Sequence, residues 1–458
     1  MRREARDSGL ETRDSGKRVA RQIPSPACGS RHPWHKAPWC PKGGWGKNFR
    51  WLPFGILPIL AAALFAISDS SHADIARAPG EALRVDLYTY GPGEIYWERF
   101  GHDALVLTDT RDGQAIAFNY GLFDFNQRDF FYNFARGHMN YLAAAWPLAD
   151  DLSEYEGEGR WIVAQHLNLT PRQRAQLRDF LIWNVQPQNA SYAYDYYIAN
   201  CTTRLRDALN DVLGGTLRAQ MLRQPRAFTY RSQTDRLMSG QPWLMLLLDL
   251  GLGPYADQPL NGWSGSFLPA QLMETLRSTR TADGHPLVGD ETRVAQARLP
   301  APPASSPDLR WPLFAVGLII GIAFAFAGGV RRCSRVARYG FAFGGVLYVL
   351  LAGIAGIGMV ILWALTAHRA AWANQNLLLL DPLALLLIPG VLKLANRAAC
   401  TSRFALVLAS LMTLAAIAAL IVNLAGVLPQ RNLPWVLLAL PIWLGLLSGM
   451  WRARGDRA

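Results

Sequence analysis

Hydrophobic and polar positions follow two different patterns along this chain. In its last third, apolar residues run almost without interruption over five stretches of about twenty residues each, at 311–330, 341–365, 376–394, 403–424 and 433–451. A helix of that length spans the hydrocarbon core of a bilayer, which is about 30 Å thick. We therefore predict five transmembrane helices over 311–451, preceded by a Pro- and Ser-rich linker over 299–310.

Residues 80–298 show the pattern of a globular domain instead. Apolar and polar residues alternate as they do in strands, and the turn signal Arg111-Asp112-Gly113 separates two such segments. Thr170-Pro171 is typical of a helix start and opens a predicted helix that runs to about residue 185. Strands and helices do not alternate as βαβ units, so the predicted class is α+β. We expect a helix over 125–136 and strands at 83–90, 104–108, 114–120, 141–146 and 160–169.

The N-terminal segment differs from both of these regions. Residues 1–50 are rich in Arg, Pro, Gly and Ser without apolar periodicity, which predicts a disordered basic tail. An apolar run over 51–67 follows two basic residues and is itself followed by Ser71-His72-Ala73, which fits a cleavage site between small residues. We interpret 51–73 as a secretory signal peptide, or as a signal anchor that is not cleaved.

The net charge of +12 is distributed unevenly along the chain. Residues 1–50 carry +8 and residues 311–458 carry +10, whereas residues 51–310 carry −6 and contain no lysine. An acidic domain argues against general nucleic-acid binding. If the domain lies outside the cytoplasm, ten of the twelve basic residues beyond 310 fall on the cytoplasmic side. The positive-inside rule therefore predicts a multi-pass protein of the inner (plasma) membrane, with residues 80–298 in the periplasm or its equivalent.

Cys201 is the only cysteine between residues 51 and 310, so a disulfide scaffold is excluded. It follows Asn200, and the residues after it form an apolar stripe with helical spacing, at Leu205, Ala208, Leu209, Val212 and Leu213. The thiol is therefore expected in the first turn of a helix, where free amide groups and the positive helix end favour a thiolate. Arg204, one turn on, adds positive potential. The alternative interpretation is a small buried thiol without a chemical role.

A thiolate nucleophile needs a base, normally a histidine that a third polar group orients. The histidines of the domain are His102, His138, His166 and His285. His102 is the strongest candidate because it lies directly before a predicted strand and after Gly101, which permits a close approach of the backbone. Asn119, on the next predicted strand, is our candidate for the orienting group, and Asp124 is its rival.

Three other features give weaker signals. The cysteines and histidines of 28–40 have a spacing that resembles a zinc site, but no apolar pattern surrounds them. Ser264 lies in a Gly-Trp-Ser-Gly sequence that departs from the nucleophile elbow, so a plain turn is the better interpretation. Asp381, within the third apolar run, is either a functional group or a polar break beside Pro382. We predict neither a metal nor a cofactor.

Four segments in order resemble one known family: YTYGPGEIYWERFGHDAL, FNYGLFDF, RWIVAQHLNLTPRQRAQL and YAYDYYIANCTTRLRD. They are similar to the Lnb N-terminal periplasmic domain family, over about residues 83–280, and the five apolar runs are similar to the transmembrane region of some members. That family is associated with bacterial lipoprotein N-acylation. The order of His before Cys also resembles the permuted papain-like fold of lecithin:retinol acyltransferase and NlpC-type enzymes, in which an Asn-Cys pair opens the catalytic helix.

The resemblance implies Cys201 as the nucleophile, His102 as the base and Asn119 as the third member. With the membrane segments, it implies a thiol acyltransferase that moves an acyl chain from a phospholipid to the N-terminal amine of a diacylglyceryl lipoprotein through a Cys thioester. Two alternatives stay open: a cysteine peptidase or amidase acting on cell-wall peptides, and a non-catalytic membrane protein that binds lipid or lipoprotein. Residues expected to support the site or bind substrate are Asn200, Arg204, Tyr120 and Asp124.

Overall fold

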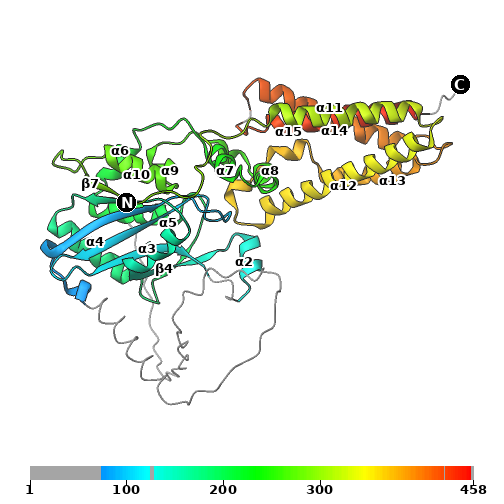
Figure 1. Ribbon diagram of the computed structural model, residues 1–458. Coiled ribbons are helices and arrows are strands. Elements are labelled where there is room, and N and C mark those ends of the chain that lie inside the picture. The colour runs from blue at the N-terminus through cyan, green and yellow to red at the C-terminus, as the bar shows by residue number, and fades with distance from the viewer. Residues whose placement is uncertain (1–73, 124–127, 428, 455–458) are drawn as a thin grey trace, which may run out of the picture. The chain divides into compact units, whose positions relative to one another are not determined.

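One antiparallel sheet of seven strands organises the N-terminal domain in the computed structural model, in the order β6-β4-β3-β2-β1-β5-β7 (Figure 1). The structure describes residues 74–123, 128–427 and 429–454. An antiparallel sheet with helices between its strands agrees with the predicted α+β class. The strands are β1 (Leu83–Tyr90), β2 (His102–Asp109), β3 (Ala115–Leu122), β4 (Asn140–Pro147), β5 (Ile162–Leu167), β6 (Ser191–Ala193) and β7 (Val288–Ala295).

The strand pairing brings the predicted site residues to one end of the sheet. β1 has the predicted bounds, whereas β2 begins two residues before the predicted strand, at His102 itself. β2 pairs with β3 so that Asn119 lies opposite Ala104, two residues from His102. Residues on one face of an antiparallel pair reach their diagonal neighbours at this spacing. No alternating pattern predicts β7, because its central residues are exposed.

Helices cover both faces of the sheet. The larger core joins Val85, Leu105 and Phe118 to Leu177 and Leu205, from helices α4 (Pro171–Asn184) and α5 (Cys201–Val212). On the other face, buried Tyr90, Ala104 and Val106 pack against α3 (Leu148–Gly157). The other helices of the domain are α2 (Phe130–Arg136), α6 (Thr216–Met221), α7 (Tyr230–Met238), α8 (Pro242–Gly251), α9 (Gly262–Gly265) and α10 (Pro269–Ser278), with short 3₁₀ turns η2 (Gly80–Ala82) and η3 (Pro254–Asp257).

Two predicted helices have different outcomes. The start of α4 is confirmed, because the Thr170 side chain accepts from the Gln173 amide and the Gln173 side chain accepts in return from the Thr170 amide. The predicted helix over 125–136 is too long. α2 starts only at Phe130, because Asp129 adopts a left-handed backbone conformation with φ of 59° that a right-handed helix does not continue through.

Five segments beyond the linker are long and apolar enough to cross a membrane. Four of them are continuous helices: α11 (Arg310–Val330), α12 (Arg335–Leu365), α14 (Arg403–Leu424) and α15 (Leu433–Arg452). The third, Arg369–Lys393, is not one helix, contrary to the prediction. It consists of short turns η4 (Arg369–Ala371), η5 (Gln375–Leu378) and η6 (Pro382–Leu387), followed by α13 (Ile388–Lys393).

Asp381 accounts for part of this interruption. Its carboxylate accepts the Leu383 amide at 2.7 Å and so caps η6, and Pro382 has no amide hydrogen with which to continue a preceding helix. Of the two interpretations that the sequence leaves open, the contacts of Asp381 match the polar break.

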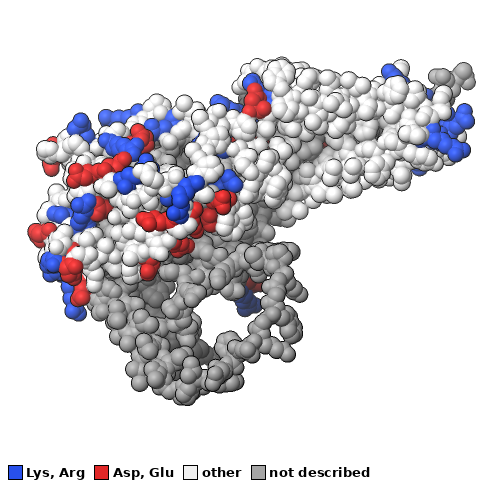
Figure 2. Space-filling model, in the orientation of Figure 1, with Lys and Arg blue, Asp and Glu red and all other residues white. Residues whose placement is uncertain are grey.

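Charged side chains are distributed differently over the two parts of the described chain (Figure 2). Lys, Arg, Asp and Glu are interspersed over the N-terminal domain, whereas the membrane segments are almost free of them along their length. Lys and Arg gather at the end of the membrane segments where the C-terminus lies. The connection between α11 and α12 contains Arg331 and Arg332. This distribution agrees with the predicted orientation.

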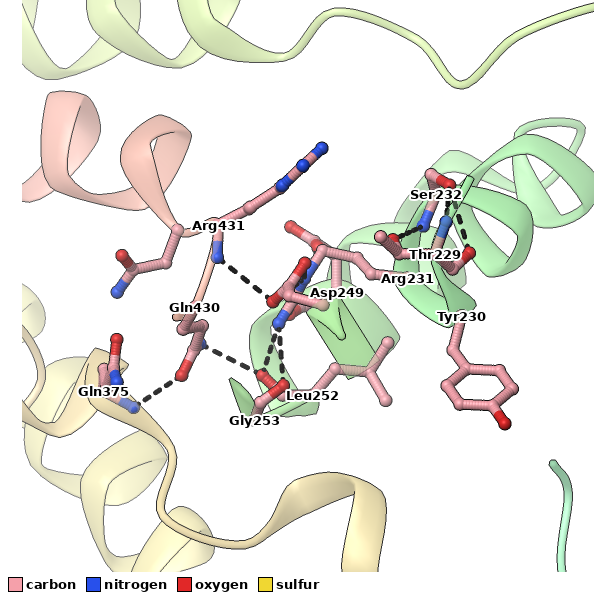
Figure 3. A network of polar contacts seen from close by, with 12 residues as sticks. Thr229, Tyr230, Arg231, Ser232, Asp249, Leu252, Gly253, Gln375, Gln430 and Arg431 are labelled. Carbon is pink, nitrogen blue, oxygen red and sulfur yellow. Dashed lines mark hydrogen bonds and ion pairs between the residues drawn. The ribbon is translucent and has the colours of Figure 1, made fainter. Parts of the chain in front are cut away.

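A buried polar network joins the domain to the membrane segments (Figure 3). Arg231 of α7 contacts the carboxylates of Asp249, on α8, and Asp257, in η3, at 2.6 and 3.0 Å. The other oxygen of Asp249 accepts the indole N–H of Trp435 in α15 at 2.7 Å. Gln430, just before α15, donates to the Leu252 carbonyl at 3.1 Å. The two parts belong to one unit, Ser68–Ala458, and side chains of both complete this network.

Candidate active site

Helix α5 begins at Cys201, as the apolar stripe predicts. Asn200 precedes it as the N-cap: its side-chain oxygen accepts the Thr203 amide at 2.9 Å, and the Thr203 hydroxyl accepts the Asn200 amide at 2.8 Å. The amide nitrogen of the Asn200 side chain donates to the Phe267 carbonyl at 2.8 Å. Asn200 thus fixes the first turn of α5, and through it the backbone that carries the thiol.

His102 is the histidine that lies beside this thiol. It occupies the first position of β2, and α5 packs against β2 and β3. Its Nε2 is 2.8 Å from the side-chain oxygen of Asn119, so Nε2 carries the hydrogen of this bond. The imidazole and the Cys201 thiol lie close enough for each to shift the pKa of the other. The structure therefore brings together Cys201, His102 and Asn119, which the sequence singles out and which lie on three separate elements.

A carboxylate that the sequence does not single out extends this series. Asp151, on α3, is fully buried and accepts the Asn119 side-chain amide at 3.1 Å. It also accepts the Tyr90 hydroxyl at 3.0 Å and the indole N–H of Trp146. Acidic residues are common in the first turn of any helix, so the position of Asp151 gives no signal of this role. The full series is Cys201, His102, Asn119 and Asp151.

The electrostatics of the pair favour a thiolate beside an imidazolium. Burial raises the pKa of the Cys201 thiol, but the charge of His102 and its hydrogen bond outweigh burial, so that the pKa is lowered overall. Burial disfavours the charged imidazole, but the charge of Cys201 and the hydrogen bonds to Cys201 and Asn119 raise the pKa of His102 to about 9. A thiolate at neutral pH is the nucleophilic form of cysteine.

One further carboxylate, Asp103, lies next to the pair but is not hydrogen bonded to it. Asp103 is fully buried, and neither of its oxygens has a hydrogen-bond partner among the described residues. Burial raises its pKa to about 6, against the opposing influence of the Thr89 and Thr202 hydroxyls and of His102. Its negative charge raises the pKa of Cys201, which opposes the influence of His102.

The remaining predicted residues have different surroundings. The guanidinium of Arg204 lies 4.9 Å from the ring centre of Tyr192. Tyr120 is buried and donates its hydroxyl to the Asn184 side chain at 2.7 Å. Asp124 and the cysteines and histidines of 28–40 lie outside the described residues.

Two other groups that could carry chemistry, His166 and Ser264, have partners elsewhere in the domain. His166, on β5, faces Asp86, on β1, with 3.3 Å between its Nδ1 and the carboxylate oxygen. Ser264 lies within the four-residue helix α9, where the predicted turn would be, and accepts the amide of the N-cap Asn261 at 3.0 Å. Over the described ranges, no group of three or more His, Cys, Asp and Glu side chains is arranged to hold a metal ion.

Comparison with known proteins identifies both parts of the chain. A family model described as the Lnb N-terminal periplasmic domain matches residues 72–236, and one described as the Lnb transmembrane domain matches residues 308–454. No curated protein and no solved structure matches the chain. The chain therefore belongs to the Lnb family, as a multi-pass membrane protein with a periplasmic N-terminal domain.

Proposed function

We propose that this protein is a membrane-bound thiol acyltransferase, which moves an acyl chain from a phospholipid to the N-terminal amine of a bacterial lipoprotein. The observation that carries the proposal is the series Cys201, His102, Asn119 and Asp151, with the thiol at the start of a helix. An ionised thiol, a histidine that carries its proton and a buried polar series that orients the histidine are the parts of a cysteine nucleophile. The order of His before Cys supports a permuted papain-like centre.

The proposed reaction has two steps. In the first, the Cys201 thiolate attacks the carbonyl carbon of a phospholipid ester. A carbon–sulfur bond forms, the ester carbon–oxygen bond breaks, and His102 gives its proton to the departing lysophospholipid oxygen. In the second, the lipoprotein amine attacks the thioester, the carbon–sulfur bond breaks, and His102 takes the amine proton. The thiolate and imidazolium are then restored.

Contacts between the domain and the membrane segments support lipid substrates. The Tyr194 ring stacks on Tyr141 at 4.2 Å, and Tyr196, next to it, stacks at 6.0 Å on His368, which follows α12. Burial raises the pKa of Tyr194, and the charge of Cys201 raises it further, so Tyr194 lies near the thiol. Aromatic rings thus run from the candidate site to the end of a membrane span. Such rings suit the boundary between lipid and water.

One observation favours the second candidate, a peptidase or amidase. A cleft of about 570 Å³ lies along the outer side of α5, and charged side chains of Arg204, Arg206, Asp207 and Asp211 line it. A peptide suits a polar cleft better than an acyl chain does. The cleft lining includes neither Cys201 nor His102, however, so the first candidate is the better supported of the two.

A labelling experiment tests the proposal. The full chain in lipid nanodiscs is incubated with a phospholipid radiolabelled in its acyl chains, and the protein is then treated with neutral hydroxylamine, which cleaves thioesters. We expect label that hydroxylamine removes, and that moves to an added diacylglyceryl lipopeptide as a stable amide. The Cys201→Ala variant should carry no label. Variants at the exposed Cys333 and Cys400, each changed to Ser, serve as matched controls and should label normally.

Three results contradict the proposal. Equal label on Cys201→Ala shows that the acyl group is not held there. Label that leaves only as free fatty acid, even with the lipopeptide present, indicates a hydrolase. Absence of label, together with cleavage of cell-wall peptides that depends on Cys201, indicates the peptidase.

A further inference from the structure

The series Cys201, His102, Asn119 and Asp151 does not include the hydroxyl of Tyr192. Tyr192 lies on β6, and its hydroxyl oxygen is buried without a hydrogen-bond partner among the described residues. A buried hydroxyl that makes no hydrogen bond costs roughly 1–3 kcal/mol, so such a group is rare without a reason. The hydroxyl of Tyr197, by contrast, shares a hydrogen bond of 2.9 Å with Thr234.

The space that this hydroxyl borders lies over Gly121. The register of β3 against β4 shifts at this residue, and Gly121 adopts a φ of +92°, which residues with side chains rarely adopt. A methyl group on Gly121 would stand 3.5 Å from Cβ of Cys201, and 3.9 Å from both the Cys201 amide nitrogen and the Tyr192 hydroxyl oxygen. The glycine thus leaves open a space that the nucleophile and two hydrogen-bond donors border.

The second donor is the backbone amide of Cys201. Cys201 is the first residue of α5, and the first amides of a helix have no carbonyl within the helix to bind. The positive end of the helix adds to the attraction for negative charge at this point. An amide and a hydroxyl that converge beside a nucleophile are the usual elements of a site for a developing oxyanion.

We propose that the space over Gly121 is the oxyanion site of this centre, and that the Tyr192 hydroxyl is its side-chain donor beside the Cys201 amide. The proposal rests on the acyl transfer proposed above. When the thiolate attacks the ester carbonyl, the carbonyl π electrons move to oxygen, which accepts hydrogen bonds from both donors. The carbonyl re-forms as the ester bond breaks. The same donors serve the second step, when the amine attacks the thioester.

The surroundings keep Tyr192 in the form that donates. Burial raises the pKa of its hydroxyl well above the ordinary value, and the charge of Cys201 raises it further, so the phenol keeps its proton. The Arg204 guanidinium over its ring lowers this pKa in part, but burial outweighs it, and the stacking holds the ring in place. This stacking gives the predicted residue Arg204 a positioning role that acts through Tyr192.

The Tyr192→Phe variant tests the proposal, because it removes only the hydroxyl and keeps the ring on which Arg204 stacks. Two rates are measured on the full chain in nanodiscs: acylation of Cys201 in a single turnover, and alkylation of Cys201 by iodoacetamide. Acylation passes through an oxyanion, and alkylation does not. We expect acylation to fall by about 100-fold or more and alkylation to stay within about twofold. Tyr197→Phe, whose hydroxyl pairs with Thr234, should change neither rate.

Two acyl donors, the radiolabelled phospholipid and p-nitrophenyl butyrate, separate this proposal from the proposed function. If the wild type accepts acyl from both and Tyr192→Phe acylates as fast, the oxyanion site is wrong and the function stands. A parallel loss of acylation and alkylation indicates a structural role and also overturns it. If only the nitrophenyl ester reacts and Tyr192→Phe slows that reaction selectively, the oxyanion site stands and the phospholipid donor is wrong. A wild type that accepts neither donor overturns both.

Discussion

Replacing Asp103 with asparagine should stabilise the periplasmic domain at neutral pH. Asp103 is fully buried on β2, and its carboxylate has no hydrogen-bond partner among the described residues. Asparagine has the same shape without the charge, and the Thr89 and Thr202 hydroxyls that lie beside the carboxylate stay beside the amide. The substitution therefore removes the cost of burying an anion while keeping the packing around it.

The pKa of Asp103 sets the size of the gain in stability that we expect from Asp103→Asn. Burial raises it from 3.8 to about 6 in the folded protein. Because the folded pKa lies above the unfolded one, the contribution of Asp103 to stability is full below pH 3.8 and is lost as the pH rises through 6. The difference corresponds to about 3 kcal/mol, at about 1.4 kcal/mol for each pKa unit. For a domain of this size, that is about 6–12 °C in the unfolding midpoint.

The assay compares unfolding midpoints of the wild type and Asp103→Asn, followed by tryptophan fluorescence of the full chain in detergent. The two midpoints should nearly coincide at pH 4 and separate as the pH rises to 7.5, with the variant higher. Other buried carboxylates, such as Asp151 and Asp257, titrate in both proteins and cancel in the difference. A difference that stays constant between pH 4 and 7.5 would contradict the prediction, because it would show that Asp103 does not change its ionisation in this range.

Two further substitutions test the series of Cys201, His102, Asn119 and Asp151, and the junction, by which we mean the buried network of Arg231, Asp249 and Asp257 that joins the domain to the membrane segments. Asn119→Ala removes the acceptor for His102 Nε2. Since a hydrogen bond to a charged group contributes about 1.5–3 kcal/mol, alkylation of Cys201 by iodoacetamide at pH 7 should slow by about tenfold. An unchanged alkylation rate would contradict the orienting role of Asn119. Arg231→Met leaves two carboxylates of the junction without their cation, and should lower the stability of the full chain by about 3–5 kcal/mol in chemical denaturation. Arg236→Met, on the same helix, is its control, and equal loss in both variants would show that the junction pair is not the cause.

The start of α5 and the position of His102 could be predicted because both depend on local patterns. Asn200 and Thr203 have the residue types of a helix cap, and the apolar stripe after them requires one face of the helix to be buried. The turn over 111–113 fixes the pairing of β2 with β3, and this pairing brings Asn119 to His102. Short-range rules of this kind are sufficient to assemble three residues of the site.

The residues that the sequence did not reveal depend on long-range contacts. Asp151 reaches Asn119 only because α3 packs on the face of the sheet opposite α5. No pattern in the sequence of α3 predicts which face of the sheet this helix covers. Tyr192 belongs to a three-residue strand among several tyrosines that look alike in sequence. The interruption of the third membrane segment could be predicted only in part. Asp381-Pro382 indicates a break, but the length of the apolar run alone predicts a continuous helix.

The buried charges at the junction bear on how a substrate reaches the thiol. Buried ion pairs seldom add much net stability, but they are strict about geometry. Asp249 accepts from Trp435 of α15, and Gln430 donates to the Leu252 carbonyl, so a sliding of the domain along the spans breaks both of these bonds at once. Tyr230, next to Arg231, packs at 5.0 Å against Phe267, whose carbonyl holds Asn200. Packing is therefore continuous from the spans to the cap of α5. In the proposed reaction, the Cys201 thiol therefore keeps its position relative to the membrane segments, and the acyl donor moves from the bilayer to the thiol.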